Sequence, residues 1–230
     1  MRRNSLQRLQ RIFLFILIIA FLGIGLIGGR IAGFGLPNLD GTPVQGFVAD
    51  LFNKQVAIIS GHAESDSGAV CEDETGRVTL QEADVNARIA NLAARRLRRA
   101  GADVMLLDEF DPRLDGLRAD LLISLHSDSC IDASGYKAAT NADAPLVAEE
   151  ARLLECIDKS YAAATGLVRN PNTVTDDMTQ YHAFNSIDPA TPVVILEMGF
   201  LGGDRTLLED RPQFAAQGVA DSVICFLAGE

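Results

Sequence analysis

Residues 56–62 read VAIISGH, an apolar run that leads directly into a glycine and a histidine. A short run without polar alternation, bounded by glycine, is typical of a strand that is buried on both faces of a sheet. Three further runs along the chain have the same apolar character. We therefore predict four strands, at Val56–Ser60, Ala102–Leu107, Asp120–His126 and Val193–Glu197.

A helical pattern separates the first two predicted strands and covers about Leu80–Arg99. Thr79 precedes this pattern, and Glu82 lies three residues after Thr79. This spacing predicts a capping box at the start of the helix. Gly101 marks the end of the helix. The apolar residues that repeat at helical spacing are Val85, Ile89 and Leu92,.

Two more helices are predicted after the third strand, at about Pro145–Ala164 and about Pro212–Leu227. Strands that alternate with helices, and that are apolar throughout, indicate a sheet covered by helices on both faces. The fold class predicted from these patterns is therefore α/β, with a mainly parallel sheet flanked by helices.

An uninterrupted apolar run without charge occupies residues 12–29 and is just long enough to cross a bilayer as a helix,. A cleaved signal peptide and a buried core helix are the alternatives, but the run has no clear cleavage site and no polar face. We interpret residues 12–30 as a transmembrane anchor. Four arginines precede the run and one follows it, which places residues 1–11 in the cytoplasm and the rest outside.

The chain after the anchor divides into two parts. Residues 31–54 contain glycine, proline and asparagine with little periodicity and are predicted to be a linker,. Residues 55–230 are long enough for one domain with a sizeable core.

The charge of the outer part argues against one class of partner. All 31 acidic residues follow the predicted anchor, together with 15 of the 20 basic ones, so this part carries a formal charge of −16. Binding to phosphates requires a basic face. We therefore expect no nucleic acid as a partner.

The four cysteines form no C-x-x-C pair, so a zinc knuckle is not expected,. Cys71 and Cys130 each follow one of two loops that contain a histidine, and a disulfide between them is possible outside the cytoplasm. Cys156 and Cys225 lie within apolar helical patterns, and we interpret them as buried free thiols.

Ionisable residues stand at the ends of three predicted strands. His62 follows the first, His126 ends the third and Glu197 ends the fourth. Ligands of α/β sheets bind beyond the carboxyl ends of the strands. Glu82 lies on the helical stripe that faces the sheet, so its side chain should point toward the same edge.

Two imidazoles and one carboxylate are a common ligand set for catalytic zinc, and a further carboxylate can act as the general base for water. Taken singly, a histidine after a strand is more often structural and Glu82 more often caps a helix. The four residues together favour a metal site.

The motifs around these residues resemble those of the zinc-dependent N-acetylmuramoyl-L-alanine amidases of the Amidase_3 type. GHAESDSGA at 61–69 resembles the family's G-H-G-G-x-D-x-G-A, and EADVN at 82–86 its E-x-x-x-N. ADLLISLHSDS at 119–129 and TPVVILEMGFLGGDRTLL at 191–208 resemble two later blocks. The resemblance covers about residues 56–227.

The resemblance implies a zinc enzyme that acts on peptidoglycan or muropeptides and hydrolyses the amide between the lactyl group of muramic acid and L-alanine. It implies that His62, Glu82 and His126 bind Zn²⁺ and that Glu197 is the catalytic glutamate. It also implies a sheet of about six strands.

The sequence departs from the family pattern at several places near the site. Ile59 and Ser60 replace the Asp-Pro that precedes Gly-His, Glu64 replaces the second loop glycine, and Asp128 replaces an asparagine. If the missing Asp orients a zinc-binding histidine, its loss weakens the metal site. Asp66 is a candidate for that role, and Asp128 is a candidate for contacts with substrate.

Three further residues are candidates for support of the site. Asn86 lies one helical turn after Glu82 and could brace its carboxylate by a hydrogen bond. His182 lies just before the last predicted strand and could contact a ligand or the substrate. Tyr181 is a candidate of the same kind.

Two other functions remain open at this point. A zinc carboxypeptidase that acts on stem peptides could use similar ligands, and a wall-binding domain without catalysis could have the same fold. The products separate the two enzymes, because an amidase leaves a free lactyl carboxyl and a carboxypeptidase releases an amino acid.

Overall fold

The computed structural model describes residues 51–143 and 145–229, which belong to a compact unit that spans Ala49–Glu230. The predicted cytoplasmic tail, the anchor at 12–30 and nearly all of the linker lie outside the described residues. Within the described ranges, no helix is both long enough and apolar enough to cross a membrane.

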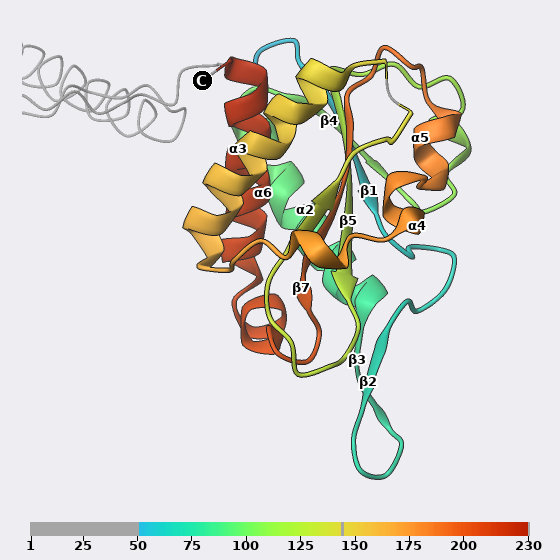
Figure 1. The fold of residues 1–230 in the computed structure, drawn as a ribbon, viewed down its shortest axis with the longest axis vertical. Coiled ribbons are helices and arrows are strands. Elements are labelled where there is room, and N and C mark those ends of the chain that lie inside the picture. Colours follow the sequence, from blue (N-terminus) through green and yellow to red (C-terminus); the bar gives the residue numbers. More distant parts are fainter. Residues whose placement is uncertain (1–50, 144, 230) are drawn as a thin grey trace, which may run out of the picture. The chain divides into compact units, whose positions relative to one another are not determined.

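A five-stranded sheet forms the centre of this unit (Figure 1). Its strands, in spatial order, are β4 (Asp103–Leu107), β1 (Gln55–Ser60), β5 (Leu121–Asp128), β7 (Val193–Phe200) and β6 (Lys137–Ala139). The first four are parallel, and β6 pairs antiparallel with β7 at one edge. All four predicted strands are therefore present, and the carboxyl ends of the parallel strands meet at one edge of the sheet.

The expected number of about six strands is too high for the sheet in the described residues. The other two described strands, β2 (Val70–Glu72) and β3 (Val78–Gln81), pair with each other in a separate hairpin (Figure 1). Most of their side chains are at least partly exposed, so they lack the continuous burial of a central strand,. The three-residue strand β6 is too short to give a pattern in the sequence.

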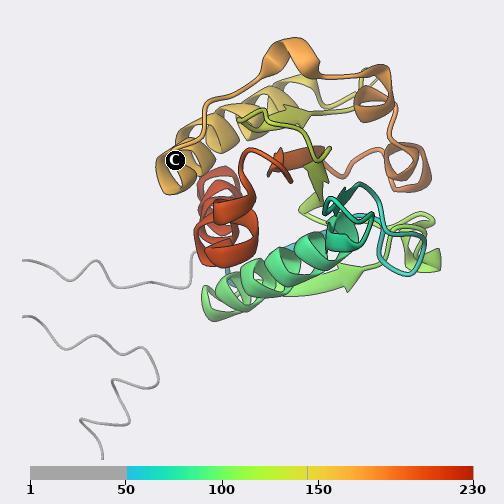
Figure 2. The ribbon, with the colours of Figure 1, turned by 90° about the horizontal axis from the view of Figure 1, so that it is seen from below.

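Helices cover both faces of the sheet. Figures 1 and 2 show α2 (Glu82–Arg99), α3 (Val147–Thr165) and α6 (Pro212–Ala228) side by side, and the short helices α4 (Asp176–Thr179) and α5 (His182–Ser186) apart from them. The remaining elements are short: η1 (Pro112–Leu114), η2 (Pro171–Thr173) and η3 (Thr206–Asp210).

Alternation along β7 explains why both faces are covered. Val194, Leu196 and Met198 pack into the core beneath α2, α3 and α6. Val193 and Ile195 point to the opposite face and join the core beneath α4 and α5. Because both sets are apolar, the strand is stable only between two layers of helices.

The predicted capping box at the start of α2 is wrong. Thr79 lies in β3, where its hydroxyl donates a hydrogen bond to the carbonyl of Cys71 at 3.2 Å. The helix begins at Glu82, and the cap residue Gln81 makes no side-chain hydrogen bond to it. The strand continues up to the helix, so Thr79 is two residues too early to act as a cap.

All four cysteines are in disulfides. Cys71 is bonded to Cys130, which attaches the β2–β3 hairpin to the loop after β5. Cys156 is bonded to Cys225, which joins α3 to α6 with 5.7 Å between the Cα atoms. The interpretation of Cys156 and Cys225 as free thiols is therefore wrong. Helical periodicity places each cysteine on a buried face, but it does not indicate which helix packs opposite.

Candidate metal centre

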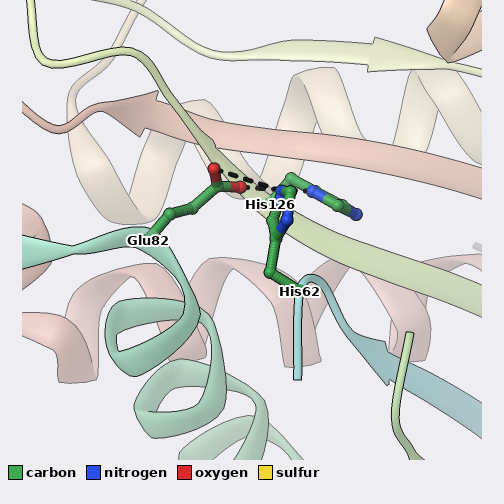
Figure 3. A group of neighbouring side chains, drawn as sticks. All are labelled: His62, Glu82 and His126. Atoms are coloured by element: carbon green, nitrogen blue, oxygen red, sulfur yellow. Dashed lines mark hydrogen bonds and ion pairs between the residues drawn. The ribbon is translucent and has the colours of Figure 1, made fainter. Parts of the chain in front are cut away.

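Three side chains that are distant in the sequence meet at the carboxyl end of the parallel strands. His62 lies two residues after β1, His126 lies near the end of β5, and Glu82 is the first residue of α2. Figure 3 shows both imidazole rings next to the Glu82 carboxylate. The structure thus brings together the three residues that the sequence predicted as metal ligands.

The Glu82 carboxylate lies between the two rings. Its Oε2 is 3.3 Å from Nε2 of His62, and its Oε1 is 3.2 Å from Nδ1 of His126. One potential ligand atom from each residue lies within 4.8 Å of those of the other two. These three atoms therefore surround a single point that a metal ion could occupy.

The backbone around His62 adopts an uncommon conformation. His62 and Glu64 have φ angles of 67° and 55°, in the left-handed region that glycine adopts most readily,. The carbonyl of His62 accepts hydrogen bonds from the amides of Ser65 and Asp66, each at 3.1 Å. These bonds stabilise a tight turn that directs the imidazole toward Glu82.

Asp66 contacts the nitrogen of His62 that faces away from Glu82. Its Oδ1 is 2.6 Å from Nδ1 of His62, and it also accepts a hydrogen bond from the amide of Gly68 at 2.7 Å. A proton held on Nδ1 leaves Nε2 free to bind a metal. The sequence proposed Asp66 for this role, and the structure places its carboxylate at this nitrogen.

Asn86 forms a hydrogen bond with the third candidate ligand, Glu82, as the sequence predicted. Its Nδ2 donates to Oε1 of Glu82 and to the carbonyl of Gly61, both at 3.2 Å. Ser127 adds its backbone amide to the same Glu82 oxygen at 3.0 Å, and its hydroxyl donates to Asn86 at 2.9 Å. Glu82 is therefore held in place by its own helix and by β5.

The charges at the centre favour a cation. Burial alone would raise the pKa of Glu82, but hydrogen bonds with His126, His62 and the amide of Ala69 lower it, so the carboxylate stays ionised,. The hydrogen bond with Glu82 raises the pKa of His62 to about 9. Burial opposes the charged form of His126, yet Glu82 and neighbouring carboxylates outweigh it and raise its pKa. A divalent cation can replace the protons that this site attracts.

Glu197 differs from Glu82 in its surroundings. It lies on β7, paired in register with His126 on one side and Lys137 on the other. Its Oε2 is buried and has no hydrogen-bond partner, and burial raises the pKa of its carboxyl to about 7. A carboxylate with that pKa is suited to accept and return a proton near neutral pH.

Three other predicted residues have partners outside the group of three. Asp128 forms an ion pair with Lys137 and accepts hydrogen bonds from Ser129. His182 is 2.8 Å from Glu109, and its ring lies 4.4 Å from that of Phe110. The hydroxyl of Tyr181 also donates to Glu109. None of the three belongs to the group of candidate ligands.

Sequence reasoning missed Glu109 and Lys137. Glu109 lies in the loop directly after β4, and its carboxylate accepts the backbone amide of His62 at 2.7 Å. Its position after a parallel strand was a usable signal, because such loops meet at the same edge of the sheet. Lys137 gave no such signal, since β6 was not predicted.

Comparison with known proteins supports the resemblance seen in the sequence. The profile of the Amidase_3 family, described as N-acetylmuramoyl-L-alanine amidase, matches residues 56–224. No curated protein matches the chain significantly.

Several solved structures share the fold. The amidase Ami1 from Mycobacterium smegmatis superimposes with a TM-score of 0.61 at 15% identity, covering 78% of this chain and 99% of that one. CwlD from Clostridioides difficile, solved in complex with the GerS lipoprotein, gives 0.59 at 17%, covering 77% and 100%. The catalytic domain of CwlV from Bacillus (Paenibacillus) polymyxa gives 0.54 at 24%, covering 74% and 96%. At these identities the likeness shows a common fold.

The tight packing of Gly68 against the ligands generates a prediction. A Cβ added at Gly68 would lie 2.5 Å from Oε2 of Glu82 and 2.7 Å from Cδ2 of His62, so Gly68→Ala must displace both ligands. We expect the zinc affinity of the full-length protein to fall by about 10–100-fold, as is typical when ligand support is lost. Competition with a chromophoric chelator measures it.

Gly76→Ala is the matched control for that experiment. Gly76 also has a positive φ, 77° against 59° for Gly68, but its Cβ would meet no atom within 4 Å. Both variants carry a similar backbone strain, and only Gly68→Ala disturbs the ligands. Equal zinc affinity in the two variants would contradict the assignment of the centre.

Proposed function

This chain belongs to the Amidase_3 family of N-acetylmuramoyl-L-alanine amidases, and on that premise we propose that it is a zinc hydrolase of peptidoglycan. The bond cleaved is the amide between the lactyl group of N-acetylmuramic acid and L-alanine. One observation carries the proposal: a two-histidine, one-carboxylate centre lies beside Glu197, a separate carboxyl group with a pKa near 7. Metal-assisted attack of water on an amide needs both parts.

The donor set of the centre fits zinc. Two imidazole nitrogens and one carboxylate oxygen, from His62, His126 and Glu82, are a usual protein ligand set for a catalytic zinc site,. Zinc held there supplies Lewis acidity toward an amide carbonyl and water. The buried oxygen of Glu197, which has no donor of its own, is the group left to receive a proton.

Glu197 performs the proton transfers in the proposed mechanism. It takes a proton from the attacking water and later delivers it to the departing alanine nitrogen. Burial raises its pKa to about 7, so both its acid and its base forms are populated near neutral pH. Glu82 does not suit this task, because the hydrogen bonds that it accepts keep its carboxylate ionised.

Other residues of the chain fix the orientation of the ligand side chains. Asp66 keeps a proton on Nδ1 of His62, and Asn86 with Ser127 fixes the Glu82 carboxylate. Lys137 is paired with Asp128, so this buried cation is not free to bind the terminal carboxylate that a carboxypeptidase recognises. The amidase is therefore favoured over the carboxypeptidase.

We also propose that the domain lies outside the cytoplasmic membrane, attached through residues 12–30. The apolar run with four preceding arginines supports this orientation,. Two disulfides support it as well, because disulfides persist in oxidising compartments,.

The location can be tested in bacterial spheroplasts that express the chain with an epitope at its N-terminus. Added protease should digest the domain and leave the epitope protected, because only the domain is expected outside the membrane. A protected domain, or a digested epitope, would show the opposite orientation.

The role of Glu197 can be tested with Glu197→Gln. We expect hydrolysis of muropeptides to fall by at least about 100-fold, because the variant has no group to accept the proton from water. Zinc content should stay at the wild-type level. Mass spectrometry of the wild-type products should detect a free lactyl carboxyl, whereas release of a single amino acid would indicate a carboxypeptidase.

Glu150→Gln is the control for this substitution. Burial also raises the pKa of Glu150 to about 7, but its carboxyl interacts with Thr140 and the amide of Val193, at the opposite end of β7. Activity should survive in that variant. Wild-type activity in Glu197→Gln would rule out the assigned role, and a zinc-loaded wild type that binds wall fragments without cutting them would favour a binding domain.

The raised pKa of Glu197 also predicts how stability depends on pH. The folded-state pKa of about 7 exceeds the ordinary value of 4.5, so the stability contributed by the protonated form is complete below about pH 4.5 and is lost as pH rises through 7,. Glu197→Gln should therefore raise the free energy of unfolding of the metal-free protein at pH 8 by about 1–3 kcal/mol.

Urea unfolding of wild type and variant at pH 5 and pH 8, with chelator present, measures this effect. The gain should be small at pH 5, where the glutamic acid is already neutral. A gain of the same size at both pH values would mean that the buried charge is not its cause.

A further inference from the structure

One buried carboxylate faces all three histidines of the chain. Oε2 of Glu109 is 2.7 Å from the backbone amide of His62 and 3.6 Å from Nε2 of His126. Its Oε1 is 2.8 Å from Nε2 of His182. Two of these histidines, His62 and His126, are candidate metal ligands together with Glu82. Glu109 does not belong to that ligand set.

The loop that contains Glu109 and the loop that contains His62 each donate one hydrogen bond to the other. The amide of Glu109 donates to the carbonyl of Ala63 at 3.2 Å, while the amide of His62 donates to the Glu109 side chain. His62 has a φ of 67°, so its backbone conformation needs such support,. Glu109 therefore stabilises the turn that directs the His62 ring.

Tyr181 links Glu109 to His126. The buried Tyr181 hydroxyl donates to Oε1 of Glu109 at 2.7 Å and accepts a hydrogen bond from Ser124 at 3.1 Å. It also lies 3.5 Å from Nε2 of His126. The nitrogen of His126 that faces away from Glu82 is thus surrounded by a carboxylate and a hydroxyl that are bonded to each other.

Each candidate ligand histidine has a second carboxylate on the side of its ring that faces away from Glu82. His62 has Asp66 at Nδ1, and His126 has Glu109 3.6 Å from Nε2, while Glu82 is nearer to its Nδ1 at 3.2 Å. When a metal takes the lone pair that faces Glu82, the ring proton can remain only on the other nitrogen, where a carboxylate stabilises it. Each of the two rings therefore has a carboxylate on the side that would keep its proton in the metal-bound protein.

The second carboxylate does not come from the position at which the family motif has Asp. Ile59 stands where the family motif has Asp, and it is fully buried in the same apolar cluster as Tyr181. It supplies no polar group to this side of the centre. The carboxylate on that side comes instead from the loop after β4.

We propose that Glu109 is a positioning residue that fixes the turn of His62 and, together with Tyr181, stabilises the metal-binding orientation of His126, so that both rings present a lone pair to one metal ion. The inference rests on the proposed zinc site, and it concerns affinity for the metal rather than a step of the reaction. Glu109 accepts three short hydrogen bonds of its own, which leaves it unsuited to be a further ligand.

Glu109→Gln and Tyr181→Phe test the proposal in the full-length protein, with Glu150→Gln as the control for loss of a buried carboxylate elsewhere. We expect Glu109→Gln to bind zinc about 10–100-fold more weakly than wild type. Tyr181→Phe should weaken binding less, because it leaves the carboxylate in place. The control should bind zinc as wild type does.

NMR of the backbone amides of the metal-free protein gives a readout that a loss of stability alone would not change. The amide of His62 donates to the Glu109 carboxylate at 2.7 Å, so its proton should be shifted downfield and protected from exchange in the wild type and in Glu150→Gln. In Glu109→Gln this proton should move upfield and exchange faster.

The outcomes separate this inference from the proposed function. A wild type that fails to bind zinc would overturn the zinc site itself. A wild type that binds zinc, with unchanged affinity in both variants and an unchanged His62 amide in Glu109→Gln, would overturn the role of Glu109 alone. If Glu109→Gln does not fold, the zinc affinity of Tyr181→Phe decides, and an unchanged affinity would count against the proposal.

Discussion

The contact of one carboxylate with two imidazoles, at Glu82, organises the rest of the centre. Glu82 can face both rings only because α2 begins at that residue, directly after the β2–β3 hairpin. The start of the helix is fixed by a reciprocal pair of bonds, in which the amide of Glu82 donates to the carbonyl of Ala69 and the amide of Ala69 donates to Oε2 of Glu82, each at 2.9 Å. The hairpin, the helix and the His62 loop therefore depend on the same side chain.

Three carboxylates at this edge of the sheet differ in the number of hydrogen bonds that they accept. Glu82 and Glu109 each accept several hydrogen bonds, and although burial opposes their ionisation, these bonds lower the pKa of both, that of Glu109 to about 2. Glu197 has a buried oxygen without a donor, and burial raises its pKa. The number of donors thus separates groups that remain charged from the one that can exchange a proton.

The sequence predicted what is determined locally and missed what depends on the packing of distant segments. His62 and His126 could be placed because each follows a continuous apolar run whose end is visible in the sequence. The disulfide between Cys156 and Cys225 could not be predicted, because nothing in the sequence of either helix indicates which helix packs against it. The place of Glu109 after a strand was visible in the sequence, but its contacts were not, because its three histidine partners come from three other segments.

The departure at Glu64 shows how much the backbone of the His62 loop is constrained. The family motif has glycine there, and the φ of 55° explains why, since this region is free of steric cost only for glycine,. A glutamate with the same φ costs about 1–2 kcal/mol. The turn nevertheless forms, because the amides of Ser65 and Asp66 bond the His62 carbonyl and the amide of His62 bonds Glu109. The position of His62, a candidate metal ligand, is therefore maintained by hydrogen bonds around the loop rather than by the preference of the loop's own residues.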